Sequence, residues 1–282
     1  MVTITTKSSN VLVQPAIYLI LIIAFFYLLF ILFYHFPDNF DKTVVTSKNT
    51  TSYVINLDKN PERLEQIRQS YQSSDIREIP FKRFPAILGK NVDIDAWLTP
   101  EAIEELEQVE KKQYRNYHYQ LTRGAIGCFL SHYTLAKQLL SDKRNNYYMI
   151  MEDDSVVHPQ GFKEIQEAMV NCPPDWDIIL FGFIRIIHPE PVGNFIKPGG
   201  FWGLHGYLIN KSGAKKVVAE TDKIKMDGQL DAFISRMIQQ NKINVYAYKN
   251  QLFHQVGRTS DIQSGIRLRE GINPFNYRGY IV

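Results

Sequence analysis

The chain has 282 residues, of which 45% are hydrophobic, so it can bury a substantial core and is not a disordered tail. Its 32 Lys and Arg against 29 Asp and Glu leave a formal charge of +3, too balanced for a general nucleic-acid or anionic-membrane surface. Two cysteines cannot build a disulfide framework or a CxxC metal site. We expect Cys128 and Cys172 to be buried free thiols, with a single bridge between them as the alternative.

The first fifty residues differ in composition from the rest. No formal charge occurs between Lys7 and Asp38, and residues 16–36 are nearly all Leu, Ile, Phe and Tyr, about the length that spans a bilayer. A buried soluble helix is the alternative. The pattern predicts a tail at 1–15, a transmembrane anchor at 16–36, a polar stem at 37–51 and a catalytic head at 52–282. The flanking charges favour a single-pass, type II protein with a cytoplasmic N-terminus and a translocated head, lumenal in a eukaryotic or viral setting.

The head opens as an alternation of strands and helices. A β-branched run at 52–57 predicts the first strand, and Asp58 and Asn60-Pro61 then start a helix. Further along the chain the sequence predicts a strand or loop at 83–89, a charged surface helix at 100–113, a helix at 122–140, strands at 147–151, 177–183 and 202–210, a helix from Ser212-Gly213 and a last strand at 243–248. This order predicts an α/β fold with a largely parallel sheet and helices on both faces.

The apolar strand at 147–151 ends in three consecutive acids, Glu152, Asp153 and Asp154. Open α/β sheets bind ligands at the carboxyl ends of their strands. Three adjacent carboxylates repel one another, so they need a proton or a cation, and Mg²⁺ or Mn²⁺ suits oxygen ligands. The alternative is a solvated turn whose Asp caps the next helix.

Two further pairs of polar residues are candidates for binding a nucleotide. Asn56 and Arg63 follow the first strand, where α/β folds accept nucleotides, although Arg63 can equally be a solvated helix charge. Ser131 and His132 interrupt an otherwise apolar helix, so they must find partners. A hydrogen-bonded structural His is one explanation, and a nucleotide or metal contact is the other.

Three residues nearer the C-terminus could contribute to catalysis or metal binding. Asp227 and Asp231 lie four apart and could share a helical face, where either could act as general base toward an acceptor hydroxyl. The alternative is that Asp227 caps the helix and Asp231 is a solvated surface residue. His254, past the last strand, could complete a metal shell or lie at the surface.

The head resembles glycosyltransferase family 25, which includes lipooligosaccharide galactosyltransferases and collagen hydroxylysine galactosyltransferases. The resemblance covers roughly Ser52 to Gln263. Seven motifs occur in the same order: YVINLDKNPERLE, FPAILGK, LTRGAIGCFLSH, YYMIMEDDSVV, GYLINKSGAKKVV, MDGQLDAF and SDIQ. Each is weak alone, and their order makes the resemblance specific.

The resemblance implies a GT-A fold, a UDP-linked sugar donor, a divalent metal (Mn²⁺ or Mg²⁺) and transfer with inversion. It assigns Asp153, Asp154 and, through the general habit of this fold to add a C-terminal metal His, His254 to the metal, and Asp227 best matches the family's later Asp, a candidate base. The residues that we expect around the donor are Asn56, Arg63, Ala86, Gly89, Ser131, His132, Glu152, Gly206 and Tyr207.

The sequence therefore predicts a membrane-anchored enzyme that moves a hexose, galactose or glucose, to a hydroxyl of a glycan or protein acceptor. We expect no nucleic-acid partner. Inverting transfer needs no enzyme nucleophile, and no GxSxG elbow is present. The rival functions are a metal-dependent phosphoesterase or nucleotidyltransferase, and an inactive sugar-binding module on the same fold.

Overall fold

The computed structural model describes residues 45–117, 120–256, 261–262 and 266–268. All of these described residues belong to one compact unit. The predicted anchor at 16–36 and most of the predicted stem lie outside the described residues, so both stay predictions. In the described part of the chain, no helix combines the length and the apolar character that a bilayer span requires.

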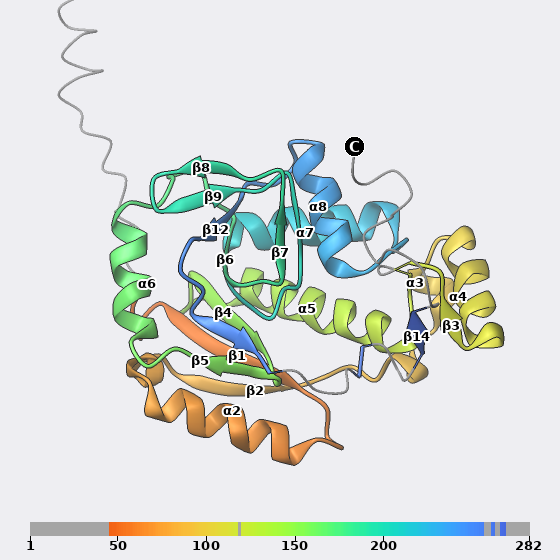
Figure 1. The fold of residues 1–282 in the computed structure, drawn as a ribbon, viewed down its shortest axis with the longest axis horizontal. Helices are drawn as coiled ribbons and strands as arrows, with labels where there is room; N and C mark the ends of the chain where they lie inside the picture. The colour runs from red at the N-terminus through yellow and green to blue at the C-terminus, as the bar shows by residue number, and fades with distance from the viewer. Residues whose placement is uncertain (1–44, 118–119, 257–260, 263–265, 269–282) are drawn as a thin grey trace, which may run out of the picture. The chain divides into compact units, whose positions relative to one another are not determined.

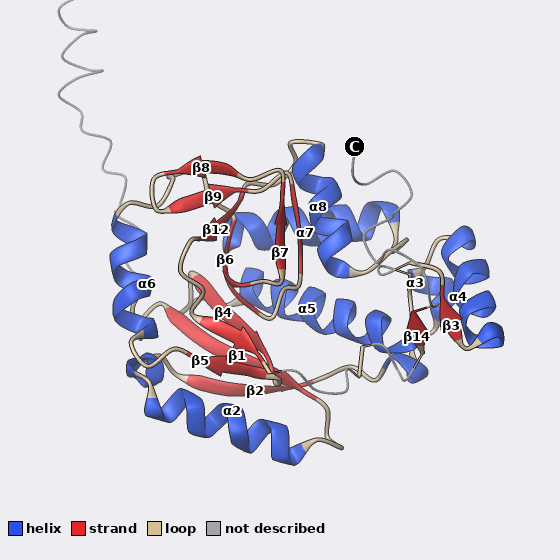
Figure 2. Ribbon diagram, viewed as in Figure 1, coloured by secondary structure: helices blue, strands red, loops and turns tan. Residues whose placement is uncertain are grey.

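A central sheet of eight strands organises the head, in the order β2-β1-β4-β11-β6-β12-β9-β8 (Figure 2). Six of the eight share one direction, while β9 and β11 run against them, so the sheet is mostly parallel as predicted. The strands are β1 Thr50–Asn56, β2 Phe81–Pro85, β4 Tyr147–Glu152, β6 Ile178–Gly182, β8 Glu190–Val192, β9 Phe195–Lys197, β11 Gly206–Asn210 and β12 Val245–Tyr248.

Two predictions about strands need adjustment. The head begins inside the predicted stem, because β1 starts at Thr50 and Val45 is already buried. The single strand predicted at 202–210 was wrong. The backbone turns at Gly203, whose φ is 79°, and the run divides into β10 (Gly200–Trp202), paired with β7 (Arg185–Ile187), and the antiparallel β11.

The predicted helices form, and side chains cap several of them. Thr122 caps α5 by accepting from the amide of Ala125 at 3.1 Å, and Asn210 caps α7 by accepting from Gly213 at 2.8 Å. The helices are α2 Pro61–Ser73, α3 Ile94–Trp97, α4 Pro100–Lys112, α5 Arg123–Ser141, α6 Gly161–Val170, α7 Lys211–Ile224 and α8 Leu230–Gln239, with 3₁₀ turns η1 Asp75–Glu78 and η2 Gly89–Asn91. The short strands are β3 Tyr114–Arg115, β5 Ser155–Val157, β13 Phe253–Gln255 and β14 Arg267–Leu268.

Helices cover both faces of the sheet, as the sequence predicts. Alternate residues of each central strand point to opposite faces. In β4, Tyr148 and Ile150 belong to the core layer under α5, α7 and α8, whereas Met149 and Met151 belong to the layer under α2 and α6. Figure 1 shows these two helical layers on either side of the sheet. β4 is therefore buried on both sides up to the point where its acids begin.

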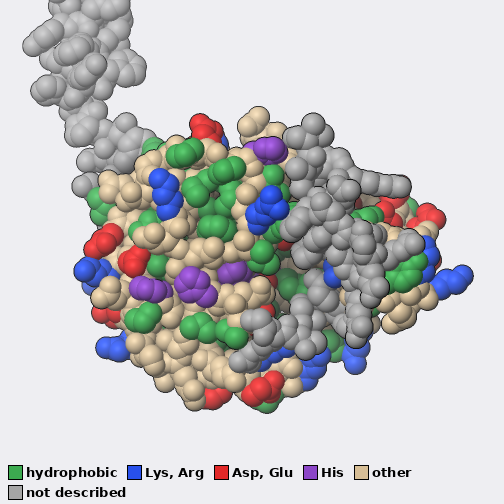
Figure 3. Space-filling model, in the orientation of Figure 1, with side chains coloured by type: hydrophobic (Ala, Val, Ile, Leu, Met, Phe, Trp, Pro, Cys, Tyr) green, Lys and Arg blue, Asp and Glu red, His purple; other side chains and the backbone are tan. Residues whose placement is uncertain are grey.

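The surface shows no segregation of charge on the face drawn in Figure 3. Basic and acidic side chains are interspersed there among the described residues, and several histidines gather near the middle of the face. Because opposite charges alternate over short distances, their fields largely cancel beyond a Debye length of about 10 Å. We therefore expect the charged side chains that bind a ligand to lie in a cleft.

Candidate active site

The carboxyl ends of β1 and β4 open into a cleft of about 530 Å³. Its walls come from the start of α2, the loop after β2, the first turns of α5 and residues 261–262. The lining residues are Ile55, Leu57, Lys59, Arg63, Ala86, Ile87, Leu88, Gly89, Lys90, Arg123, Gly124, Cys128, Glu152, Asp153, Asp154, Asp261 and Ile262. The cleft therefore brings together four basic side chains, four acids and an apolar wall.

Close backbone packing fixes the wall formed by the loop after β2. A Cβ added at Gly89 would lie 1.6 Å from the carbonyl oxygen of Arg123, and one added at Gly127 would lie 2.2 Å from that of Ile87. Only glycine fits at both positions. Ser131 holds the same loop, since its hydroxyl accepts from the amide of Ile87 at 2.9 Å. Ala86 and Gly89 thus line the cleft where the resemblance predicts the nucleotide, while Ser131 supports the loop from behind.

Parallel pairing of β1 with β4 places Asn56 beside the acids. Ile55 pairs with Glu152, so Asn56 follows at the level of Asp153, and its amide donates to Asp153 Oδ2 at 2.7 Å. Arg83 on β2 in turn donates to Asn56 Oδ1 at 2.9 Å. Asn56 is only 2% exposed. Asn56 therefore orients an acid of the cleft and is not itself part of the lining.

Arg63 lies between two carboxylates. Its Nη1 is 3.6 Å from Asp153 Oδ1 and 2.9 Å from Asp261 Oδ2. Only 14% of the Arg63 side chain is exposed, so the solvated helix charge that was the alternative does not describe it. Lys59 and Asn60 also donate to Asp261, at 2.5 and 2.7 Å. Although burial opposes it, these contacts lower the pKa of Asp261 below its ordinary value.

The three acids after β4 lie in a turn, and the neighbouring donors and cations compensate only part of their negative charge. Burial and the charge of Asp153 raise the pKa of Glu152 to about 7, and burial with the charge of Glu152 raises the pKa of Asp154 to about 6. Burial also raises the pKa of Asp153, against the opposing effects of Asn56 and Arg63. The solvated turn is excluded, because none of the three is exposed.

The acids fit a divalent cation. Gln255 donates to Asp154 Oδ2 at 2.9 Å, but Asp154 Oδ1 is buried and has no hydrogen-bond partner. A buried carboxylate oxygen without a donor is costly, and a hard cation on Asp153 and Asp154 would remove that cost and the repulsion from Glu152. The hydrogen-bond donors among the described residues leave the Asp154 Oδ1 atom without a partner.

The structure does not bring His254 to these acids. In β13, Phe253 points inward and packs at Gly206, so its neighbour His254 points out and is exposed. Gln255, one residue further, is the side chain of this strand that reaches Asp154. His254 is absent from the cleft lining and from any group of metal-ready ligands among the described residues.

His132 and Tyr207 form a buried pair behind the cleft. The Nδ1 atom of His132 is 2.9 Å from the Tyr207 hydroxyl, and the two rings stack with centroids 5.6 Å apart. Burial lowers the pKa of His132 to about 3, so the ring is neutral. Gly206 lies where an added Cβ would meet the Phe253 ring at 2.5 Å. These three predicted donor residues pack beneath the site and do not line it.

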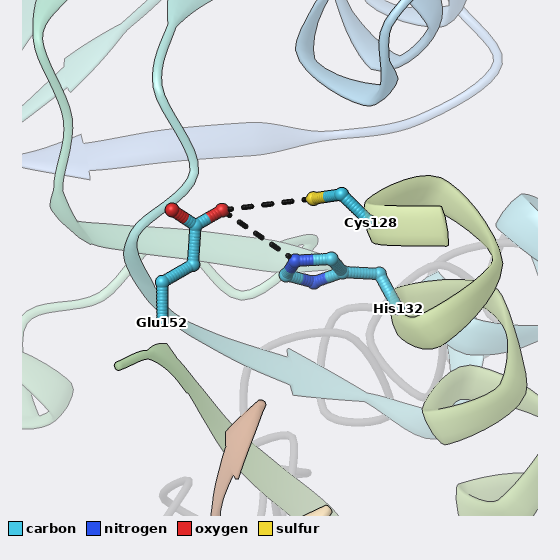
Figure 4. A group of neighbouring side chains, drawn as sticks. All are labelled: Cys128, His132 and Glu152. Atoms are coloured by element: carbon cyan, nitrogen blue, oxygen red, sulfur yellow. Dashed lines mark hydrogen bonds and ion pairs between the residues drawn. The ribbon is translucent and has the colours of Figure 1, made fainter. Parts of the chain in front are cut away.

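His132 also faces Glu152, together with a thiol that the sequence analysis placed in the core. Figure 4 shows Cys128 and His132 projecting from α5 toward the Glu152 carboxylate. The Glu152 Oε1 atom is 3.8 Å from Cys128 Sγ and 3.8 Å from His132 Nε2. Both cysteines are free, as predicted, but each is only partly buried, and Cys128 lines the cleft.

The two candidate bases have different surroundings. The prediction that they could share a helical face was wrong. α8 starts only at Leu230, so Asp227 precedes it, and Gln229 is the capping residue. Both oxygens of Asp227 accept from Arg236, one of them at 2.7 Å. Asp231 accepts only from the amides of Gly203 and Ala232, at 3.0 and 2.9 Å. Burial, with a contribution from the charge of Glu152, raises the pKa of Asp231 to about 6.

Sequence reasoning missed several cleft residues. Lys59, Lys90 and Arg123 resemble ordinary surface charges, and their only signal in the sequence is that each lies inside one of the seven motifs. Asp261 lies inside the SDIQ motif, which is the one signal that could have indicated it. The sequence does not show that the Cys128 thiol faces the cleft, because its exposure depends on how α5 is rotated about its axis.

A comparison with protein families identifies the family of this chain. A model of Glycosyltransferase family 25 (LPS biosynthesis protein) matches residues 49–197, more than half of the chain, and includes the acids after β4. The chain belongs to glycosyltransferase family 25. The family predicted from the seven motifs is thus confirmed.

Curated relatives carry related names. Procollagen galactosyltransferase 2 of Homo sapiens is 31% identical over 210 residues, covering 70% of this chain and 31% of the relative. Procollagen galactosyltransferase 1-A of Xenopus laevis is 28% identical over 207 residues, covering 69% and 32%. The chain therefore spans about a third of the length of these family 25 relatives.

Among solved structures, that of GalNAc-T7 with UDP, GalNAc and Mn²⁺ is similar at 9% identity, with a TM-score of 0.46, covering 76% of this chain and 44% of that one. We draw nothing from a likeness of that size. The family membership rests on the sequence, and the site rests on the contacts between its own residues.

Proposed function

We propose that this family 25 protein transfers a hexose, galactose or glucose, from a UDP-sugar to a hydroxyl of a glycan or protein acceptor. In this proposal the head has a GT-A fold, uses Mn²⁺ or Mg²⁺ and inverts the anomeric carbon. The observation that carries the proposal is the buried, unpartnered oxygen of Asp154 among three acids at the end of β4. The names of the galactosyltransferase relatives support the choice of sugar.

The charges of the cleft suit a metal-bound diphosphate. Glu152, Asp153 and Asp154 line the cleft together with Lys90 and Arg123, and Arg123 is also paired with Glu110 at 3.0 Å. A nucleoside diphosphate with its cation presents both signs of charge, since the cation faces carboxylates while the phosphate oxygens accept from basic groups. A neutral sugar alone would not need this arrangement.

The chain's own residues position the acids that would hold the cation. Asn56 and Arg63 fix Asp153 from one side, and Gln255 fixes one oxygen of Asp154 from the other. Bound there, the cation supplies charge stabilisation for the departing diphosphate. The apolar wall at Ala86 and Ile87 excludes water from the nucleotide and so strengthens these interactions.

Asp231 is the better candidate for the general base. A base must be free to take a proton, and Arg236 occupies both oxygens of Asp227. Asp231 has no cation on it among the described residues, and its pKa of about 6 lets it be ionised at neutral pH yet accept a proton. The charge of Asp231 also acts on Cys128 and Glu152, which both line the cleft.

A donor screen tests the proposal. The full chain in detergent is incubated with UDP-galactose, UDP-glucose and other UDP-sugars, with glycan or collagen-like acceptors, and UDP release is measured with and without Mn²⁺. We expect acceptor-dependent UDP release that requires the metal. Release of inorganic phosphate would indicate a phosphoesterase instead, and binding of UDP-sugar without turnover would indicate a binding module.

We also propose that residues 16–36 anchor the protein in a membrane as a type II protein. The apolar run and the charges around it support this orientation. Protease treatment of sealed vesicles should spare the head. Digestion of the head without opening the vesicles would contradict it.

A further inference from the structure

We propose that Cys128, His132 and Glu152 form a binding site for a borderline divalent cation of the Zn²⁺ class. This site is separate from the one proposed for Mn²⁺ or Mg²⁺ on Asp153 and Asp154. It does not depend on sugar transfer, because it rests on ligand geometry alone. Figure 4 shows the three side chains converging on one point.

The spacing in the sequence brings two of the ligands to one helical face. Cys128 and His132 are four residues apart in α5, the same separation that places two zinc-binding His on one face of a helix. Glu152 approaches from the end of β4, on the opposite side of the gap. Two elements that the core packs together therefore fix all three groups.

The thiol of Cys128 donates a long hydrogen bond to Glu152 Oε1, whereas the contact between Glu152 Oε1 and His132 Nε2 is too long for one. Glu152 Oε1 is 3.8 Å from both Cys128 Sγ and His132 Nε2, and the three ligand atoms all lie within 4.8 Å of one another. A nitrogen–oxygen hydrogen bond would need about 3 Å. Around a tetrahedral zinc ion, neighbouring sulfur, nitrogen and oxygen ligands are about 3.4–3.6 Å apart, so a small adjustment closes the site.

His132 supplies an independent sign of a ligand. The residue is 3% exposed, and its Nε2 atom, which faces Glu152, has no hydrogen-bond partner. Its other nitrogen is 2.9 Å from the Tyr207 hydroxyl, and stacking on the Tyr207 ring fixes the plane of the imidazole. Metal-binding histidines are oriented in this way by a contact at the second nitrogen.

The ligand set selects the kind of ion. A thiolate and an imidazole favour Zn²⁺ or Cd²⁺, whereas Mg²⁺ and Mn²⁺ prefer oxygen ligands. Ions can reach the site, because both Cys128 and Glu152 line the cleft. An ion held there also occupies Glu152, so Zn²⁺ and the sugar donor would compete for the same end of the cleft.

Titration with Cd²⁺ tests the site directly. Cd²⁺ is added to the full chain in detergent with excess Mg²⁺, and the ultraviolet charge-transfer absorption of a cadmium–thiolate bond is followed. We expect it to saturate at one ion per chain, to persist in Cys172→Ser and to vanish in Cys128→Ser. Cys172→Ser is the matched control, since it removes the chain's other thiol. No absorption in the native chain, or absorption that survives Cys128→Ser, would overturn the proposal.

Thermal unfolding with Zn²⁺ gives a second readout that needs no thiol signal. An ion that binds only the folded state raises the melting temperature. We expect Zn²⁺ to raise it in the native and Cys172→Ser chains, and expect Glu152→Gln to weaken Zn²⁺ binding by about tenfold or more. Circular dichroism checks that each variant folds. If Cys128→Ser does not fold, Glu152→Gln decides, and an unchanged Zn²⁺ response would count against the site.

Discussion

Two aspartates that flank strands of the same direction, one before β6 and one after β4, differ in how their charge is satisfied. Asp177, just before β6, is 1% exposed, and its Oδ2 atom accepts from Lys216 at 2.5 Å and from the amide of Asn244 at 2.8 Å. Asp154, just after β4, has one oxygen bonded to Gln255 and another with no hydrogen-bond partner. The chain supplies the cation for a structural carboxylate, whereas the carboxylate of a binding site is left for a ligand to complete.

The same contrast separates the two acids of the MDGQLDAF motif. Arg236 neutralises Asp227, while only backbone amides contact Asp231. A carboxylate without a cation keeps a raised pKa and can exchange a proton near neutral pH. We therefore infer that Asp227 is a structural residue and that Asp231 is the acid of this pair that serves the site.

The largest expected effect concerns Asp231. Asp231→Asn should lower kcat by about 10²–10⁴-fold, the usual contribution of a general base. In the native chain, kcat should rise as pH increases through about 6, because the ionised form takes the proton. Steady-state UDP release against pH measures both. Asp227→Asn is the matched control, and a larger loss there than at Asp231 would reverse the assignment.

Asp154→Asn should lower metal-dependent turnover by about two orders of magnitude or more, through lost charge stabilisation. Its unfolding free energy should not fall, since the buried oxygen loses no partner. Asp177→Ala should behave in the opposite way, retaining turnover while losing about 1–3 kcal/mol of stability, because the Asn244 amide and Lys216 lose their acceptor. Urea unfolding and UDP release, measured on both variants, check this. If Asp154→Asn and Asp177→Ala lost the same unfolding free energy, the contrast between the two aspartates would be wrong.

Stability should also respond to pH. The folded-state pKa of Asp154 is about 6, above its ordinary value of 3.8, so the folded chain retains a proton that the unfolded chain releases. The stabilising contribution is complete below pH 4 and is lost as pH rises through about 6. We expect this loss to be about 2–3 kcal/mol, and Asp154→Asn to remove it. Urea unfolding from pH 4 to 7 measures it, and a pH dependence unchanged by the substitution would contradict the assignment.

The smallest expected effect concerns the paired, exposed end of the cleft. Lys59 is 61% exposed where it meets Asp261, so Lys59→Ala should cost less than about 1 kcal/mol of stability. Arg63 still contacts Asp261 in that variant. Thermal unfolding measures the change, with Lys163→Ala, from the exposed pair with Glu167, as the control. A stability loss several times larger for Lys59→Ala than for Lys163→Ala would show that the Lys59–Asp261 contact is more than an exposed ion pair.

The sequence was sufficient for the main strands and helices that frame the cleft and for the place of the acids at the end of β4. Parallel strands end at the same edge of a sheet, so polar residues that follow two adjacent parallel strands must converge. Buried β-branched and apolar runs identified β1 and β4, and their neighbours then followed from topology. The acids could be located without coordinates because their position depends on this backbone rule alone.

Other features could not be predicted, because they depend on direction, rotation or exact start points. The apolar run at 202–210 contains no sign that its last part runs antiparallel, or that Gly203 turns the chain. Asp227 and Asp231 share the right spacing for one helical face, but α8 begins between them. Strand alternation turned His254 outward, and the rotation of α5 turned Cys128 into the cleft.

The reversed strand β11 has a consequence for the surroundings of Asp231. Gly206, where β11 enters the sheet, pairs with Gly182, where β6 leaves it, so residues 183–205 depart and return at one point. This segment contains β8 and β9, so it adds the last two strands to one edge of the central sheet before it returns. Its last residues hold Gly203 against Asp231. One continuous segment therefore supplies both an edge of the sheet and a backbone donor to Asp231, so a change within it would reach that acid without touching Gly89 or Gly127.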